Sequence, residues 1–169
     1  MKLKLLVAAL PVAMALAAPS ADASIYMYSG VACAAATASQ SSCLDRSQYG
    51  IANTCPVSVA VECPVTLSMT NGRIGSTSSI SLQAYDRNAN ANADVSCNIE
   101  RMDVNGNPLH TVNFKTSAGG PGTGLQNISG STSGSPIDAS AWRLRCTLPA
   151  VASSGWFSHV VSYQMNTNQ

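Results

Sequence analysis

The chain has 169 residues, and its 9 basic and 8 acidic side chains give a net charge of +1. Charged residues are only 10% of the chain, against about 25% in an ordinary globular protein. This composition offers no basic patch for nucleic acid and no polybasic run for an anionic membrane surface. We therefore expect no nucleic-acid partner, and we expect neutral polar residues to supply solubility.

The first 23 residues have the three parts of a secretory signal peptide. Lys2 and Lys4 form a positive start, residues 5–18 form an apolar run, and Ala21-Asp22-Ala23 fits a small-residue cleavage site. We expect cleavage after Ala23, with cleavage after Ala17 or Ala18 as alternatives.

The alternative interpretation of this segment is a transmembrane anchor. An anchor needs roughly 20 apolar residues, and Pro11, Pro19 and Ser20 shorten the usable run. The sequence therefore predicts a mature chain of residues 24–169, folded as one domain, secreted or periplasmic, with no membrane anchor after signal cleavage.

All six cysteines follow the expected cleavage site. An even number of cysteines in an exported chain predicts disulfides, and the chain contains no Cys-x-x-Cys pair of the kind that binds zinc. Six cysteines allow fifteen pairings, and spacing alone does not choose among them. The pairing that we favour is Cys33–Cys63, Cys43–Cys55 and Cys97–Cys146, of which the last would join two distant strands.

Alternating apolar residues predict β-strands along the whole mature chain. An irregular, Ala- and Ser-rich segment interrupts them at 30–55, and turn signals lie at 71–72 and 105–108. The expected strands cover residues 25–29, 57–63, 78–86, 95–102, 109–115, 125–128, 142–148 and 156–165. Short strands at this spacing predict an all-β fold, a single antiparallel β-sandwich of the immunoglobulin-like or jelly-roll type.

The alternation also predicts which side chains enter the core. Val57, Val59, Val61 and Cys63 share one face of their strand, and the inward face of 109–115 should carry His110, Val112 and Phe114. Other inward faces are expected at Ile80, Leu82 and Ala84, at Val95, Cys97 and Ile99, and at Trp142, Leu144, Cys146 and Leu148.

Four short segments resemble a group of small, secreted, uncharacterised bacterial proteins. They are Gly30-Val-Ala-Cys33, Tyr49-Gly-Ile-Ala-Asn53 leading to Cys63-Pro64, Tyr85-Asp-Arg-Asn88 leading to Asp94-Val-Ser-Cys97, and Arg143-Leu-Arg-Cys146-Thr-Leu-Pro149. The resemblance implies export and a disulfide-bearing β fold, with Cys43 and Cys55 as a pair added to the four cysteines of the group. It implies no activity.

One segment offers oxygen side chains at every second position, as a calcium site requires. Its members are Asp86, Asn88, Asn90, Asn92 and Asp94. An EF-hand is excluded, because Ala91 stands where glycine is needed and Cys97 where a bidentate glutamate is needed. Another loop site, helped by Asp103 and Asn105, stays open beside the alternative of a solvated turn.

Catalytic motifs are incomplete, and we assign no catalytic residue. Residues 130–134 resemble a nucleophile elbow, but their centre is Thr132 and not serine. Residues 117–121 resemble a serine-protease turn but contain an extra Ala118. The two histidines, His110 and His159, fall on or near expected strands, and no acidic residue stands at a spacing that indicates a catalytic triad. The seven acidic residues of the mature chain show no spacing that indicates a pair across a cleft.

Aromatic residues are the remaining candidates for a binding site. Trp142 should be buried, and burial is also the favoured place for Trp156 and Phe157, although the preceding Ser-Ser-Gly could put this pair at a loop tip. The tyrosines at 26, 28 and 49 are further candidates. Residues 127–129 match an N-glycosylation sequon.

The preferred hypothesis is an exported, non-enzymatic module that has a structural role or binds an extracellular ligand or cell-surface component. The first alternative is a secreted hydrolase with a site assembled from scattered residues, centred on His110 or His159. The others are a calcium-dependent binder and an assembly subunit, in which Ile25-Tyr-Met-Tyr28 would extend a neighbour's sheet. No cofactor other than calcium is expected.

Overall fold

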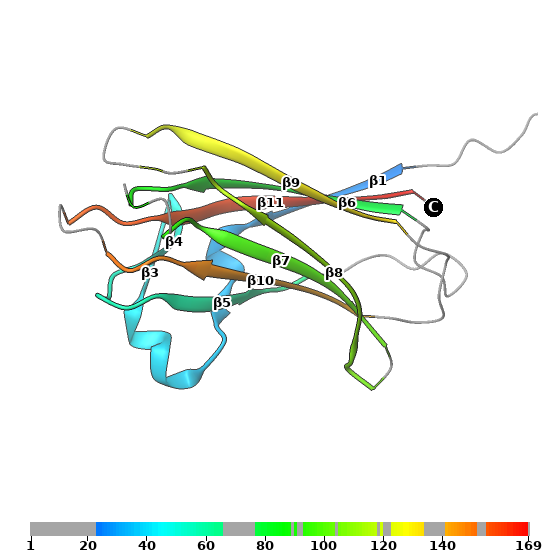
Figure 1. Ribbon diagram of the computed structural model, residues 1–169, viewed down its shortest axis with the longest axis horizontal. Coiled ribbons are helices and arrows are strands. Elements are labelled where there is room, and N and C mark those ends of the chain that lie inside the picture. Colours follow the sequence, from blue (N-terminus) through cyan, green and yellow to red (C-terminus); the bar gives the residue numbers. More distant parts are fainter. Residues whose placement is uncertain are drawn as a thin grey trace, which may run out of the picture.

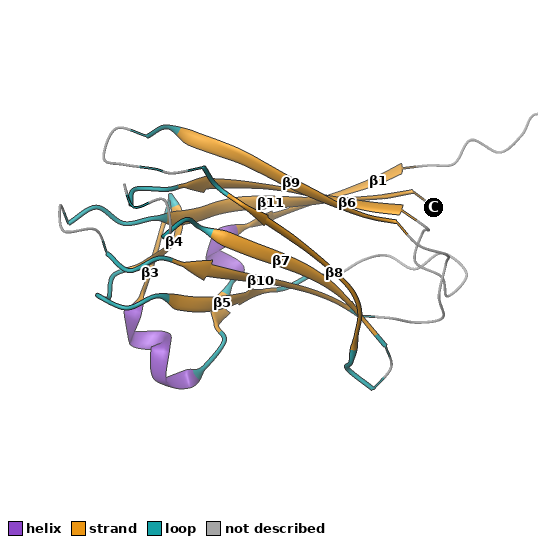
Figure 2. Cartoon of the chain, in the orientation of Figure 1, coloured by secondary structure: helices purple, strands orange, loops and turns teal. Residues whose placement is uncertain are grey.

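The computed structural model describes residues 23–65, 77–88, 90, 93–103, 105–117, 119, 123–133, 141–151 and 155–168. The expected signal peptide lies outside these residues except for Ala23, and so does the expected turn at 71–72. Among the described residues, no helix is both long enough and apolar enough to cross a membrane. The two helical segments are short 3₁₀ turns, η1 (Gly30–Ala32) and η2 (Ala38–Cys43), both in the irregular region (Figure 2).

The strands follow one another as the alternation predicted, with three short additional strands inside the region 30–55 that was expected to be irregular. Their bounds are β1 (Ala23–Ser29), β2 (Ala34–Ala35), β3 (Leu44–Ser47), β4 (Gly50–Asn53), β5 (Val59–Cys63), β6 (Thr77–Tyr85), β7 (Ser96–Met102), β8 (Pro108–Lys115), β9 (Leu125–Ser133), β10 (Trp142–Leu148) and β11 (His159–Asn168).

Two antiparallel sheets lie face to face (Figure 1), so the predicted all-β sandwich is confirmed. One sheet has the order β3-β4-β11-β6-β9, with β1 paired to the later part of β11, and the other has the order β2-β5-β10-β7-β8. From β4 onward the chain crosses between the sheets at each step except the β7–β8 hairpin. Of the two sandwich types expected, this order is that of a jelly roll.

The core lies between the sheets and contains the predicted faces. Ile80, Leu82 and Ala84 of β6 are fully buried, and so are Leu144, Cys146 and Leu148 of β10. Two members of the expected faces are exposed instead. Val57 precedes the first residue of β5 and is 56% exposed, and His110 lies near the start of β8, whose inward side is half-buried at Val112 and buried at Phe114.

Disulfides join Cys33 to Cys63, Cys43 to Cys55 and Cys97 to Cys146, the same three pairs that the sequence analysis favoured. The third pair joins directly opposed residues of β7 and β10. The first pair joins the region 30–55 to the last residue of β5, and the second closes a loop within that region.

Tyr163 of β11 links its own sheet to the segment that follows β5 in the other sheet. Its ring stacks on Tyr28 with 4.9 Å between ring centroids, and its hydroxyl donates a 2.6 Å hydrogen bond to the carbonyl of Pro64. Burial, followed by the neighbouring Tyr28, raises the pKa of Tyr163 well above its ordinary value. The phenol therefore stays neutral and acts as a hydrogen-bond donor inside the fold.

Candidate functional site

Asp86, the first residue of the predicted cation site, is completely buried. Its Oδ2 accepts hydrogen bonds from Thr116 Oγ1 (2.6 Å) and the Val95 amide (3.2 Å). Its Oδ1 accepts from the Asn88 amide (3.0 Å) and Ser158 Oγ (3.4 Å). Both oxygens thus have protein donors. This carboxylate joins the residues just after β6 and β8 to the residues just before β7 and β11.

The other predicted ligands also have protein partners. Asn88 Oδ1 accepts from the Asn90 amide, and Asn88 Nδ2 donates to the Ala150 carbonyl. Asp94 Oδ2 forms an ion pair with Lys115 at 2.6 Å, so this oxygen already has a cationic partner, whereas Asp94 Oδ1 is buried without a hydrogen-bond partner. Asp103 accepts hydrogen bonds from the amides of the 105–107 turn.

These contacts are those of successive Asx turns, the alternative that the sequence left open. The part of the chain that the structure describes contains no cluster of three or more His, Cys, Asp or Glu side chains suited to a metal. The calcium site at 86–94 stays a hypothesis from the sequence, against which these hydrogen bonds argue, and Asn92 lies outside the described residues.

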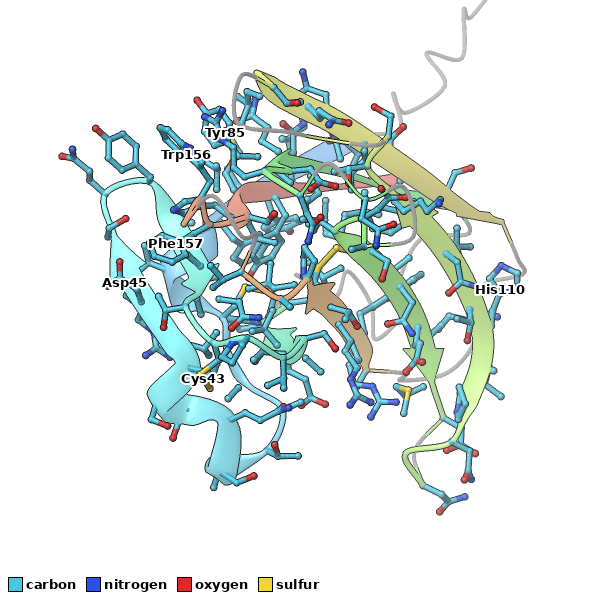
Figure 3. The ribbon with its side chains drawn as sticks, turned by 60° about the vertical axis from the view of Figure 1, so that its left-hand side comes forward. Cys43, Asp45, Tyr85, His110, Trp156 and Phe157 are labelled. Atoms are coloured by element: carbon cyan, nitrogen blue, oxygen red, sulfur yellow. A yellow bond between two sulfur atoms is a disulfide. The ribbon has the colours of Figure 1, made fainter. Side chains whose placement is uncertain are left out.

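The two histidines occupy different environments. His110 is exposed on β8, far from the aromatic residues labelled in Figure 3. His159 begins β11 and lies against Tyr85, with 6.4 Å between ring centroids in an edge-to-face arrangement. Both His159 and Asp45 pair with Ala52 of β4, so one whole strand separates them, about 10 Å at the backbone. No ion pair joins His159 to an acid among the described residues.

Trp156 is half exposed, so its expected burial was wrong. Gly155 has a φ of +75°, a conformation that favours glycine, and it turns the chain immediately before β11. This turn leaves Trp156 outside the sheet, while Phe157 is half buried and Ser158 faces the buried Asp86. The Ser-Ser-Gly that precedes Trp156 was the sequence signal for this placement.

A pocket of about 440 Å³ opens beside Trp156. It is lined by Tyr49, Tyr85, Arg87, Gly155, Trp156, Phe157 and His159, and we call it the aromatic pocket. Figure 3 shows Tyr85, Trp156 and Phe157 gathered at one end of the molecule. The lining comes from three separate segments of the chain, namely the β3–β4 turn, the end of β6 and the loop before β11.

The glycine after Tyr49 fixes the β3–β4 turn. Gly50 has a φ of 110°, and a side chain there would overlap the carbonyl of Val160. This close approach brings the turn against β11, and Tyr49 itself stays 58% exposed at the rim. The rim tyrosine is therefore positioned by backbone packing and not by burial of its own ring.

Arg87 is the charged member of the aromatic pocket. Its guanidinium carbon lies 4.8 Å from the Tyr85 ring centroid and 5.6 Å from the Trp156 ring centroid. Both distances are within the range of cation–π attraction. The cation therefore helps to hold the two rings as fixed walls of the pocket.

Burial lowers the pKa of His159 below its ordinary value of 6.5. The next largest cause, a hydrogen bond with the backbone of Phe157, raises it, the Arg87 charge lowers it, and the Asp45 charge raises it. The net lowering favours the neutral imidazole, which carries one hydrogen-bond donor and one acceptor, and of its two ring nitrogens Nδ1 is buried.

A larger hollow, of about 550 Å³, lies over the other sheet. Its polar lining includes Asn98 and Asn113 together with the cations Lys115 and Arg145, and its aromatic member, Phe114, is buried in the core. The larger hollow therefore offers no exposed aromatic ring to a ligand, whereas the aromatic pocket offers the exposed rings of Trp156 and Tyr49, which can pack on the apolar face of a ligand.

The segment expected to extend a neighbour's sheet is used within the chain itself. Residues 23–29 form β1 and pair with β11 from Ser29↔Ser162 to Ala23↔Asn168. Tyr26 and Tyr28 pack against the core, whereas Ile25 and Met27 are 62% and 75% exposed on the outer face. Asn127 of the predicted sequon is exposed on β9.

Comparisons with protein-family models and with curated protein sequences find no match. Among solved structures, the arabinose-bound MgGH51 α-L-arabinofuranosidase shares 10% identity over 69% of this chain and 18% of that chain, with a TM-score of 0.40. The enzymatically active domain of tailspike protein 4 from bacteriophage CBA120 shares 8% identity over 86% of this chain and 18% of that chain, also with a TM-score of 0.40. The chain thus spans less than a fifth of either protein, and likenesses of this size do not bear on the chemistry of the aromatic pocket.

Proposed function

We propose that this protein is an exported, non-enzymatic binding module that recognises a sugar through the aromatic pocket. The observation that carries the proposal is the exposure of Trp156 (50%) and Tyr49 (58%) around a pocket that also holds Tyr85 and Arg87. Large rings are normally buried, and exposed rings beside a few polar groups are the usual composition of a binding site.

The chemistry of the lining fits a sugar ring. A pyranose or furanose has one face of C–H groups, which packs on an aromatic ring, and an edge of hydroxyls, which needs donors and acceptors. Trp156 and Tyr49 offer ring faces, whereas the Arg87 guanidinium and the neutral His159 imidazole offer hydrogen bonds. Jelly rolls include lectin domains, but a fold does not determine function, so the proposal depends on the pocket.

Export is proposed from two features together. Residues 1–23 have the parts of a signal peptide, and three disulfides use all six cysteines of the chain, as expected in an oxidising compartment. These features support our proposal of a secreted or periplasmic location, and we propose a cell-surface or extracellular glycan as the partner.

The hydrolase alternative receives no support from the histidines. A general base must lie within hydrogen-bond reach of the proton that it takes, and an orienting acid must contact it. Asp45 is one strand away from His159, and His110 is exposed on the other sheet.

The test is calorimetric titration of the oxidised, mature protein with disaccharides of glucose, xylose, mannose, galactose and arabinose. We expect at least one to bind, and Trp156→Ala to weaken that binding about 30-fold, which corresponds to the ~2 kcal/mol typical of a tryptophan hot spot. Leu109→Ala is the matched control, because Leu109 is a comparably exposed apolar residue (46%) on the other sheet.

Two results would contradict the proposal. One is the absence of heat with every sugar, and the other is wild-type affinity in Trp156→Ala. Release of new reducing ends from an oligosaccharide, with loss of this activity in His159→Gln, would instead support the hydrolase.

A further inference from the structure

On the outer face of one sheet, the neighbouring strands β1, β11, β6 and β9 carry a regular array of uncharged side chains. Cross-strand pairing places its side chains in three rows of four: Ser29–Ser162–Gln83–Asn127, Met27–Gln164–Ser81–Ser129 and Ile25–Asn166–Ser79–Ser131. We call this array the neutral face. Its members are half-buried or exposed, whereas the residues between them on each strand point into the core.

Every polar member of the neutral face is a serine, asparagine or glutamine. Neighbouring members hydrogen bond to one another across the strands, from Ser162 Oγ to Gln83 Oε1 at 3.0 Å and from Asn166 Nδ2 to Ser79 Oγ at 3.4 Å. An amide and a hydroxyl each carry both donor and acceptor capacity, so the face presents both along its whole length.

The neutral face continues directly from the aromatic pocket. His159 and Tyr85 pair with each other and form the row that precedes Ser162 and Gln83. Along β6, every second residue from Tyr85 to Ser79 lies on this face, a distance of about 20 Å. A shallow depression of about 70 Å³ lies midway and is lined by Met27, Ser81, Gln83, Ser162, Tyr163 and Gln164.

We propose that the neutral face is the extended part of the sugar site, and that the natural ligand is therefore an uncharged polysaccharide chain. One end of the chain would occupy the aromatic pocket, and the following sugars would lie along β6 and β11 towards Ser79 and Asn166. This inference rests on the proposed function, since the aromatic pocket is its first subsite.

The composition of the face selects a neutral glycan over other polymers. Nucleic acid requires cations for its phosphates, and a protein interface of lasting affinity has an apolar centre with aromatic or arginine anchors. The apolar members of the face, Ile25 and Met27, lie on the β1 side and not at its centre. A glycan with carboxylates would find no opposing charge along the rows.

The experiment compares the affinities of a disaccharide and a hexasaccharide of each of the five neutral sugars, together with hexagalacturonate as the anionic probe. We expect a neutral hexasaccharide to bind at least tenfold more tightly than its disaccharide, and hexagalacturonate to bind no more tightly than the neutral disaccharides. Ser81→Leu, in the middle row, adds bulk without a flat ring and removes a hydrogen-bonding hydroxyl, so it should abolish the tenfold gain and leave disaccharide affinity unchanged.

The matched control is Thr147→Leu, because Thr147 is an exposed residue on the outer side of β10 in the other sheet. The comparison within wild type requires no variant, so it stays informative if Ser81→Leu misfolds. Equal affinities of disaccharide and hexasaccharide, with binding still dependent on Trp156, would contradict an extended site on the neutral face. The proposal of sugar binding at the aromatic pocket would then still stand. Binding of none of the neutral sugars would overturn both.

Discussion

The guanidinium of Arg87 lies 4.8 Å from the centre of the Tyr85 ring, two residues earlier in the chain. Tyr85 is the last residue of β6, so its ring is fixed by the sheet, and Arg87 then lies between this ring and Trp156 in the following loop. The pocket walls are thus held in place by contacts within the protein before any ligand arrives.

Arg87→Met should weaken sugar binding about fivefold, because the loss removes a cation–π contact worth ~1 kcal/mol and a hydrogen-bond donor to the ligand. Titration calorimetry with the best-binding disaccharide measures the change. Arg145→Met, on the other sheet, serves as the control. An unchanged affinity in Arg87→Met would show that the guanidinium is not part of the recognition surface.

His159 should make stability depend on pH. Its pKa is lowered in the folded protein, so the unfolded chain takes up the proton first as the pH falls. Stability from the neutral His159 is therefore complete above its ordinary pKa of 6.5 and is lost below it. Between about pH 7.5 and about pH 5.5, the Tm of wild type should fall more than that of His159→Gln, with exposed His110→Gln behaving like wild type. Identical falls in all three proteins would argue against this account of His159.

Asp86→Ala should lower the free energy of unfolding by about 3 kcal/mol, because it removes the carboxylate that accepts from Thr116 Oγ1 and the Asn88 amide and one of the two acceptors of the buried Val95 amide. Urea denaturation measures the loss. Glu62→Ala is the control, since Glu62 is exposed on β5 and surface changes cost within about 0.5 kcal/mol. A loss as small in Asp86→Ala as in the control would remove the structural role given to this carboxylate.

Calcium should leave the Tm unchanged. The oxygens of Asp86 are already occupied by protein donors, and Lys115 neutralises Asp94. Thermal melts with calcium and with chelator test this directly. A rise in Tm with calcium that Asp94→Asn abolishes would instead support the cation site that the sequence suggested.

Removing the Cys97–Cys146 disulfide by double substitution with serine should cost about 4 kcal/mol, and removing Cys43–Cys55 about 3 kcal/mol, from loop-closure entropy alone. The difference follows from sequence separations of 49 and 12 residues. The buried Cys146 adds a packing loss to the first variant. Urea denaturation of both variants gives the order, and a larger loss from the Cys43–Cys55 pair would contradict it.

The strands and core were predictable because alternation has the same period as the side chains of a strand. It placed Ile80, Leu82 and Ala84 correctly, as well as Leu144 and Cys146. It does not say which strands are neighbours, so the pairing of Tyr85 with His159, and with it the continuity of the neutral face, needed the structure.

Two side chains were misjudged because their surroundings come from distant segments. Trp156 shares its apolar character with core residues, and only the turn at Gly155 leaves it outside the sheet. Asp86 looked like a ligand in an open loop, but its donors Thr116 and Ser158 lie 30 and 72 residues further along the chain. Local spacing contains no information about such partners.

The most direct measurement of the central claim is chemical-shift mapping of the ¹⁵N-labelled mature protein titrated with the tightest-binding neutral sugar. The indole signal of Trp156 and the amides of Tyr85, Arg87 and His159 should shift together, while the indole signal of the buried Trp142 stays in place. Shifts confined to β5, β10, β7 and β8, or a Trp156 signal that does not move while sugar binds, would contradict recognition at the aromatic pocket.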